Sequence, residues 1–213
     1  MAGRRPTSSR CIAVFGPHDL ALLRLAANVQ QTVVVQAAPT IEETRYLLDL
    51  ARKEDSIAGV VGWVPLGSPD APKIIDEFAR EPKFKGVRPM LQDLPDDTWI
   101  AHAPRAEAIE RLVDLAFDAL IFARHVPSLI EFAQRYPTLR IVVDHGAKPP
   151  IRDGIDAGWQ PWADGIAQLA KLSQNLYCKL SGLATESKEN WNDETLKPYV
   201  AHLLEQFGAH RLM

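Results

Sequence analysis

The chain has 213 residues, with 24 lysines and arginines against 27 aspartates and glutamates and a formal net charge of -3. This length is enough to bury a sizeable core, and the weakly acidic balance offers no basic field for nucleic acid or an anionic membrane surface. The two cysteines, Cys11 and Cys178, form no CxxC pair, so we expect neither a disulfide framework nor a thiolate metal site.

The sequence contains no apolar run long enough to span a membrane, and its N-terminus is basic. Charged residues or prolines interrupt every apolar run well before the roughly 18 residues that a membrane span needs, which favours a soluble chain. The two isolated cysteines are consistent with the reducing cytoplasm. The N-terminus carries Arg4, Arg5 and Arg10 and no acid before Asp19. This composition is shared by organelle transit peptides and by disordered N-termini. We therefore expect residues 1–16 to be a disordered or atypical segment.

From Pro17 onward, predicted helices alternate with short apolar strands. An apolar stripe predicts a helix that begins at Pro17, and residues 32–36 (TVVVQ) are typical of a buried strand. Thr40 and Glu43 form a capping box that opens a helix ending near Arg52. Further strands are expected at 58–64, 84–91, 119–123, 141–143 and 175–180, further helices at 71–80, 106–117, 128–136, 162–173 and 196–207, and the entry to another strand at 210–213.

The strands are nearly continuous apolar runs, which predicts a parallel sheet covered by helices. Polar side chains recur at or just after the carboxyl ends of the strands. They share one mouth only if the sheet curls into a barrel, because an open doubly wound sheet would scatter them. No GxGxxG or P-loop sequence follows a strand, which disfavours the commonest nucleotide-binding folds. These strand-end residues are Gln36, Arg88, Arg124, His125, Asp144, His145, Lys148, Lys179 and Ser181.

Each candidate also has a purely structural interpretation. Asp144 is suited to capping the turn that follows it, and His145 to being a hydrogen-bonded interior histidine. His125 is equally consistent with a loop residue, and Lys148 and Lys179 with solvated or ion-paired lysines. Arg88 is the most informative, because burying a guanidinium at a strand end costs several kcal/mol unless a carboxylate or an anionic substrate meets it.

Four phrases in this order resemble one known family. They are TVVVQAAP at 32–39, GVRPMLQD at 86–93, VVDHGAKPPI at 142–151 and NLYCKLSGL at 175–183. Together they are similar to the amidohydrolase-related family, whose members include lactonases for sugar acids and pyrone dicarboxylates. The resemblance implies a TIM-barrel-like (β/α)8 hydrolase in which strand-end histidines and an aspartate bind a metal or position water.

The resemblance assigns roles to the strand-end residues. It implies His125, Asp144 and His145 as catalytic residues, with His125 and His145 as the candidate ligands of a divalent metal such as zinc. It also implies Arg88, Lys179 and Ser181 as substrate-binding residues, and Lys148 joins them because it too follows a strand.

Two departures from the family pattern stand out. The family begins with a strand ending in His-x-His, and residues 1–16 contain no histidine. The family's last strand carries an aspartate beyond the phrase GAHRLM, and the sequence ends at Met213. At 213 residues, the chain is also shorter than the roughly 250 typical of a closed barrel. We therefore expect residues 17–213 to form an incomplete barrel domain of about six βα units, with no metal or weak metal binding by this chain alone.

The function predicted from these features is hydrolysis of a lactone or related cyclic ester of a sugar acid or dicarboxylate, by metal- or histidine-assisted attack of water. The alternative is a catalytically inactive remnant or a small-molecule-binding protein of the same fold. In either case the partner is a small molecule, not nucleic acid or a membrane. Unpaired strand edges also predict self-association.

Overall fold

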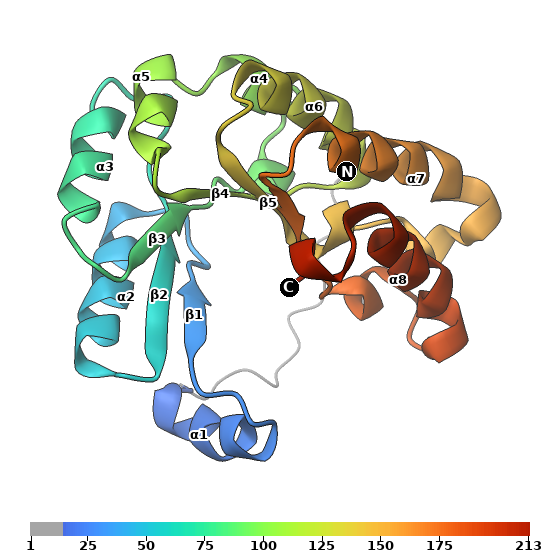
Figure 1. The fold of residues 1–213 in the computed structure, drawn as a ribbon, viewed down its shortest axis with the longest axis horizontal. Coiled ribbons are helices and arrows are strands. Elements are labelled where there is room, and N and C mark those ends of the chain that lie inside the picture. The colour runs from blue at the N-terminus through green and yellow to red at the C-terminus, as the bar shows by residue number, and fades with distance from the viewer. Residues whose placement is uncertain (1–14) are drawn as a thin grey trace.

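The computed structural model describes residues 15–213, so the expected N-terminal segment falls almost wholly outside the described residues. Six strands form one parallel sheet in the order β1-β2-β3-β4-β5-β6. Figure 1 shows the strands arranged as an open arc with the helices on its outer side. This is an incomplete TIM-barrel-like α/β fold, as predicted. The strands are β1 (Thr32–Val35), β2 (Ile57–Gly62), β3 (Phe84–Val87), β4 (Ala116–Ala119), β5 (Arg140–Val143) and β6 (Leu176–Cys178).

Helices follow the strands along the chain, as the alternating pattern predicts. Thr40 is confirmed as the N-cap of α2, since its Oγ1 accepts the Glu43 N–H at 3.1 Å. The full capping box is wrong, because the Glu43 carboxylate accepts the Ala37 and Ala38 N–H groups instead of the Thr40 N–H. None of the described helices is long and apolar enough to cross a membrane. The helices are α1 (Pro17–Ala26), α2 (Ile41–Lys53), α3 (Ala71–Phe78), α4 (Trp99–His102), α5 (Ala106–Ile109), α6 (Val126–Arg135), α7 (Ile155–Leu172) and α8 (Asp193–Phe207).

The prediction was wrong around the fourth strand. The expected helix at 106–117 ends as α5 at Ile109, followed by a 3-10 turn to Leu112, and β4 begins at Ala116 instead of Ala119. The cause is Asp118, an acid in the middle of the apolar run. Its side chain is buried against the Lys179 ammonium, so the strand tolerates it.

The expected strand at 210–213 is present only as a single bridge. After α8 the chain returns to the sheet, where Leu212 pairs in parallel with Cys178 of β6. The Leu180 N–H also donates to the Met213 carbonyl oxygen at 2.7 Å. The chain therefore reaches the far edge of the arc at its C-terminus.

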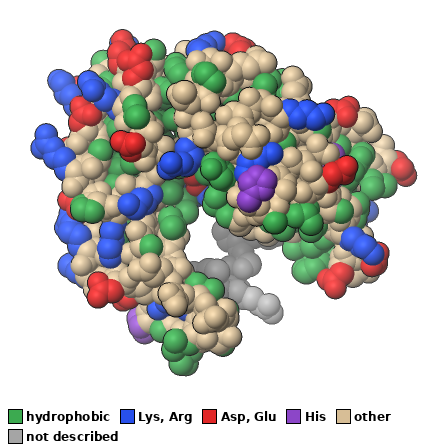
Figure 2. Space-filling model, in the orientation of Figure 1, with side chains coloured by type: hydrophobic (Ala, Val, Ile, Leu, Met, Phe, Trp, Pro, Cys, Tyr) green, Lys and Arg blue, Asp and Glu red, His purple; other side chains and the backbone are tan. Residues whose placement is uncertain are grey.

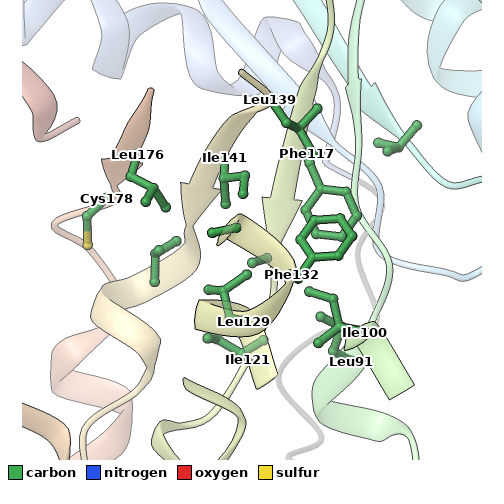
Figure 3. Close-up of a cluster of buried hydrophobic side chains, with 14 of the residues drawn as sticks. Leu91, Ile100, Phe117, Ile121, Leu129, Phe132, Leu139, Ile141, Leu176 and Cys178 are labelled. Carbon is green, nitrogen blue, oxygen red and sulfur yellow. The ribbon is translucent and has the colours of Figure 1, made fainter. Parts of the chain in front are cut away.

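The apolar core lies between the sheet and the outer helices. Phe117 of β4 packs on Phe132 of α6 with ring centroids 4.9 Å apart. Ile141 of β5 and Leu129 of α6 are buried beside them (Figure 3). Because the outer face of the sheet is occupied by this core, the polar strand-end residues are left to the inner face and the carboxyl edge.

Candidate active site

Four charged side chains from four neighbouring strands meet at the carboxyl edge of the sheet. Arg88 follows β3, Asp118 lies in β4, Asp144 follows β5 and Lys179 follows β6. Arg88 Nη1 lies 3.1 Å from Asp144 Oδ2, and Lys179 Nζ lies 2.6 Å from Asp144 Oδ1. Lys179 Nζ also contacts Asp118 Oδ2. We call these four residues the charge cluster, and three of them were predicted from the sequence.

The charge cluster is buried and balanced, with two cations facing two carboxylates. The Asp144 side chain is 0% exposed and that of Arg88 13%. Burial by itself lowers the pKa of Lys179, but Asp118 and Asp144 outweigh it, so the pKa is raised and the ammonium persists at neutral pH. Gln36, which directly follows β1, holds Arg88 through two hydrogen bonds. The Gln36 side-chain Nε2 donates to the Arg88 backbone carbonyl oxygen at 2.7 Å, and the Gln36 backbone carbonyl oxygen accepts from the Arg88 guanidinium.

His145 lies on a strained turn immediately after the charge cluster's Asp144. Four consecutive residues adopt left-handed backbone conformations, with φ of 53° at His145, 59° at Gly146, 58° at Ala147 and 48° at Lys148. Non-glycine residues seldom adopt this conformation, and it persists only where the surroundings impose it. Here the Gly146 N–H donates to the Lys179 carbonyl oxygen at 3.1 Å, and Trp162 Nε1 donates to the Gly146 carbonyl oxygen at 2.7 Å.

Residues that follow the neighbouring strand β6 hold the imidazole of His145 in its orientation. Its Nδ1 lies 2.9 Å from Ser181 Oγ. Gly182, which is left-handed with φ of 67°, leaves room for the ring, because a Cβ there would lie 2.8 Å from His145 Cγ. Burial lowers the pKa of His145, and the nearby cations Lys148, Lys179 and Arg88 add to this against the opposing charge of Asp144. The ring is therefore neutral at neutral pH and able to accept a proton.

The structure does not bring His125 to the charge cluster. Its Nδ1 accepts the Phe122 N–H at 2.9 Å, and its Nε2 lies 3.1 Å from Asp97 Oδ1. Within residues 15–213 both ring nitrogens thus face groups outside the cluster, and burial lowers the pKa of the ring. The contacts describe a histidine that stabilises the turn after β4, and its catalytic role stays a prediction.

Lys148 lies on the rim beside the cluster. Its ammonium contacts Gln92 Oε1, from the segment after β3, and is 5.1 Å from the centroid of the Phe122 ring. Lys148 thus links the loops that follow β3, β4 and β5.

A zinc ion in a protein is normally bound by three or four protein ligands. Among residues 15–213, no group of three or more His, Cys, Asp and Glu side chains is arranged to hold a metal ion. Asp118 and Asp144 already face Lys179 and Arg88, and His145 shares Nδ1 with Ser181. This donor set by itself does not fit zinc.

Comparison with known proteins agrees with this architecture. The family model for amidohydrolases, Amidohydro_2, matches residues 12–213. The chain is 51% identical to an L-fucono-1,5-lactonase of Burkholderia ambifaria, over 93% of this chain and 68% of that protein. It is 33% identical to an L-fucono-1,5-lactonase of Burkholderia multivorans, over 92% of this chain and 69% of that protein.

Solved structures have the same fold. A zinc-bound amidohydrolase from Burkholderia multivorans is 31% identical with a TM-score of 0.83, over 93% of this chain and 72% of that one. A probable 2-pyrone-4,6-dicarboxylic acid hydrolase from Acinetobacter baumannii is 14% identical with a TM-score of 0.70, over 95% of this chain and 75% of that one. At this identity the likeness supports the fold alone. The chain belongs to the amidohydrolase family, which confirms the resemblance predicted from its four phrases.

Proposed function

We propose that this chain hydrolyses the 1,5-lactone of a sugar acid. The observation that carries the proposal is a neutral imidazole, His145, held on a strained turn beside two buried cations, Arg88 and Lys179. The 51% identity to an L-fucono-1,5-lactonase supports this substrate class.

The chemistry needs a base and a place for negative charge. The oxygen of a water molecule bonds to the lactone carbonyl carbon while His145 accepts the water proton. The carbonyl oxygen gains negative charge, which the preorganised N–H groups of Arg88 and Lys179 favour. The oxyanion then re-forms the C=O bond as the ring C–O bond breaks, and His145 returns its proton to the departing ring oxygen, which becomes a hydroxyl group. The carboxylic acid formed loses a proton to solvent, and the product is an open-chain aldonate. Ser181 and Lys148 remain predicted substrate-binding residues.

Hydrolysis of L-fucono-1,5-lactone by the purified chain, measured above the spontaneous rate, tests the proposal. His145→Gln removes the base and is expected to lower kcat by about 10²–10⁴-fold. His18→Gln is the matched control, because the His18 side chain is 85% exposed on α1, far along the chain from the cluster.

The alternative of a non-catalytic binding protein has a different outcome. A wild-type chain that binds L-fuconate in a calorimetric titration but never exceeds the spontaneous rate would replace the hydrolase proposal with that alternative. A His145→Gln variant as active as His18→Gln would remove His145 from the mechanism.

A further inference from the structure

An apolar pocket of about 520 Å³ lies beside the charge cluster, at the carboxyl ends of β1, β2 and β3. Its volume is within the range of small-molecule sites. The polar groups in its lining are few: Ser68 Oγ accepts the Asp70 N–H, and Asp93 is exposed to solvent. We call it the Trp63 pocket and define it by Trp63, Pro65, Leu66, Pro89, Met90 and Trp99.

The Trp63 pocket and the charge cluster share one wall. Gly62 of β2 pairs in register with Val87 of β3, and the Arg88 N–H donates to the Gly62 carbonyl oxygen at 2.8 Å. Trp63 and Arg88 are the residues that directly follow this pair, so the two positions are neighbours at the carboxyl edge of the sheet. Pro89 and Met90 follow Arg88 directly and line the pocket.

The backbone of Trp63 is anchored at this position by α2. The buried Thr44 hydroxyl of α2 accepts the Trp63 N–H at 2.8 Å and donates to the Trp63 carbonyl oxygen at 3.0 Å. Gly62 makes the contact feasible, because a Cβ there would lie 2.4 Å from Thr44 Cγ2. These bonds order the backbone that carries the indole before a ligand binds, which lowers the cost of ordering this segment on binding.

We propose that the Trp63 pocket receives the C6 side of the sugar lactone and selects 6-deoxy sugar acids. The inference rests on the proposed function and adds the substrate class. L-Fucono-1,5-lactone carries a methyl group where L-galactono-1,5-lactone carries a hydroxymethyl group. An apolar pocket gains from burying the methyl group, whereas a hydroxyl buried there gives up its water for no hydrogen bond.

The first test compares the two lactones. We expect the wild-type kcat/KM to be about 10- to 100-fold higher for the fucono than for the galactono lactone. Trp63→Ala is expected to bring this ratio close to one, and Trp63→Phe to keep most of it. Tyr46→Ala, which truncates an exposed aromatic residue on α2, is the matched control and should leave the ratio unchanged.

The second test does not need turnover. Saturation-transfer NMR with L-fuconate reports which ligand protons contact the protein. The C6 methyl protons are expected to receive the largest saturation in the wild type and in Tyr46→Ala, and to lose that excess in Trp63→Ala.

The two proposals fail in distinguishable ways. If neither lactone is hydrolysed above the spontaneous rate, the proposed function fails, and the NMR experiment alone decides the pocket. If Trp63→Ala keeps the wild-type ratio, or if the wild-type methyl protons receive no more saturation than the ring protons, the selection by the Trp63 pocket is wrong.

Discussion

Lys179 is the residue on which the charge cluster depends most. Its ammonium lies between Asp118 and Asp144, whose side chains are 3% and 0% exposed. Lys179→Met leaves both carboxylates buried with only Arg88 to face them. Because removing one partner leaves buried charge uncompensated, we expect the free energy of unfolding to fall by about 3–5 kcal/mol in urea denaturation.

The control for this prediction is Lys197→Met, on α8. The Lys197 side chain is 69% exposed and pairs with Glu194 at 3.3 Å, so its loss should change stability by no more than about 0.5 kcal/mol. Adding Asp118→Asn to Lys179→Met removes one of the stranded charges and should restore part of the loss. Equal stability of Lys179→Met and Lys197→Met would show that the cluster contributes nothing net.

His145 predicts the pH dependence of activity. Burial lowers its pKa below the usual 6.5, and the base must be neutral, so the midpoint of the acidic fall in kcat/KM should lie below pH 6.5. Stability moves in the same direction. The unfolded chain takes up this proton first, near its ordinary pKa, so the free energy of unfolding decreases as pH drops below 6.5.

Rate profiles and urea midpoints measured across this range check both statements. The acidic limb of the rate should disappear from whatever residual activity His145→Gln retains. A wild-type rate profile whose acidic fall has its midpoint at or above pH 6.5 would contradict the lowered pKa.

Among the elements, the loop after β6 controls the ring that β5 presents. Gly182→Ala forces alanine into a left-handed conformation and brings Cβ to 2.8 Å from His145 Cγ. Gly154→Ala forces alanine into a conformation that is more strained still, with φ of 87° and ψ of 164°, and leaves nothing within 4 Å of the added Cβ. Both variants should lose about 1–3 kcal/mol of stability. Only Gly182→Ala displaces the imidazole, and we expect it to lower kcat by about 10²-fold.

Unfolding curves and lactone hydrolysis of the two glycine variants separate these effects. Since Gly154→Ala carries at least as much backbone strain, a fall in kcat confined to Gly182→Ala isolates the contact with the ring. Equal kcat values would mean that His145 need not be held by the loop.

The strand ends were predictable because each site residue directly follows an apolar run. Arg88, Asp144 and Lys179 come immediately after the last residues of β3, β5 and β6. Asp118 escaped prediction because it lies inside β4, and its partner Lys179 is distant in the sequence and adjacent only in the folded sheet. The one sign in the sequence was that Asp118 is an isolated acid within an apolar strand, which indicates that a buried cation faces it.

His125 shows the limit of reasoning from position. It follows a strand as Asp144 does, yet its ring turns back to the Phe122 N–H within the same 3-10 turn. Side-chain direction beyond a strand end depends on such local hydrogen bonds, which sequence spacing does not specify.

At the scale of the whole molecule, the parallel order and the outer helices follow from alternating apolar strands and amphipathic helices. The curl was predicted only because polar residues recur at five strand ends, and the left-handed turn at 145–148 was not predicted at all. Among the four residues of that turn, only Gly146 is of a type that commonly adopts a left-handed conformation. The other three are normally right-handed or extended, so their sequence gives no sign of the turn.

The edge of the arc at β1 carries an exposed apolar surface. α1 has no buried residue, and Leu22, Leu25 and Val33 are 79%, 73% and 54% exposed. Figure 2 shows hydrophobic side chains at the surface in this region. An apolar groove of about 510 Å³ separates α1 from β1 and α2. Among residues 15–213, β1 pairs with β2 alone, so its second edge offers unpaired N–H and C=O groups to another chain.

We therefore predict that the chain of residues 1–213 self-associates through the β1 edge in a concentration-dependent manner. Val33→Lys places a charge on the edge strand, which opposes pairing with a second chain, and Leu22→Glu with Leu25→Lys reduces the apolar area of α1. Light scattering coupled to size exclusion should show the triple variant shifted toward the monomer. Val113→Lys, at a position 78% exposed in the segment before β4, should associate like the wild type. A wild-type chain that stays monomeric at every concentration, or a Val113→Lys chain that dissociates as fully as the triple variant, would show that the β1 edge is not the contact.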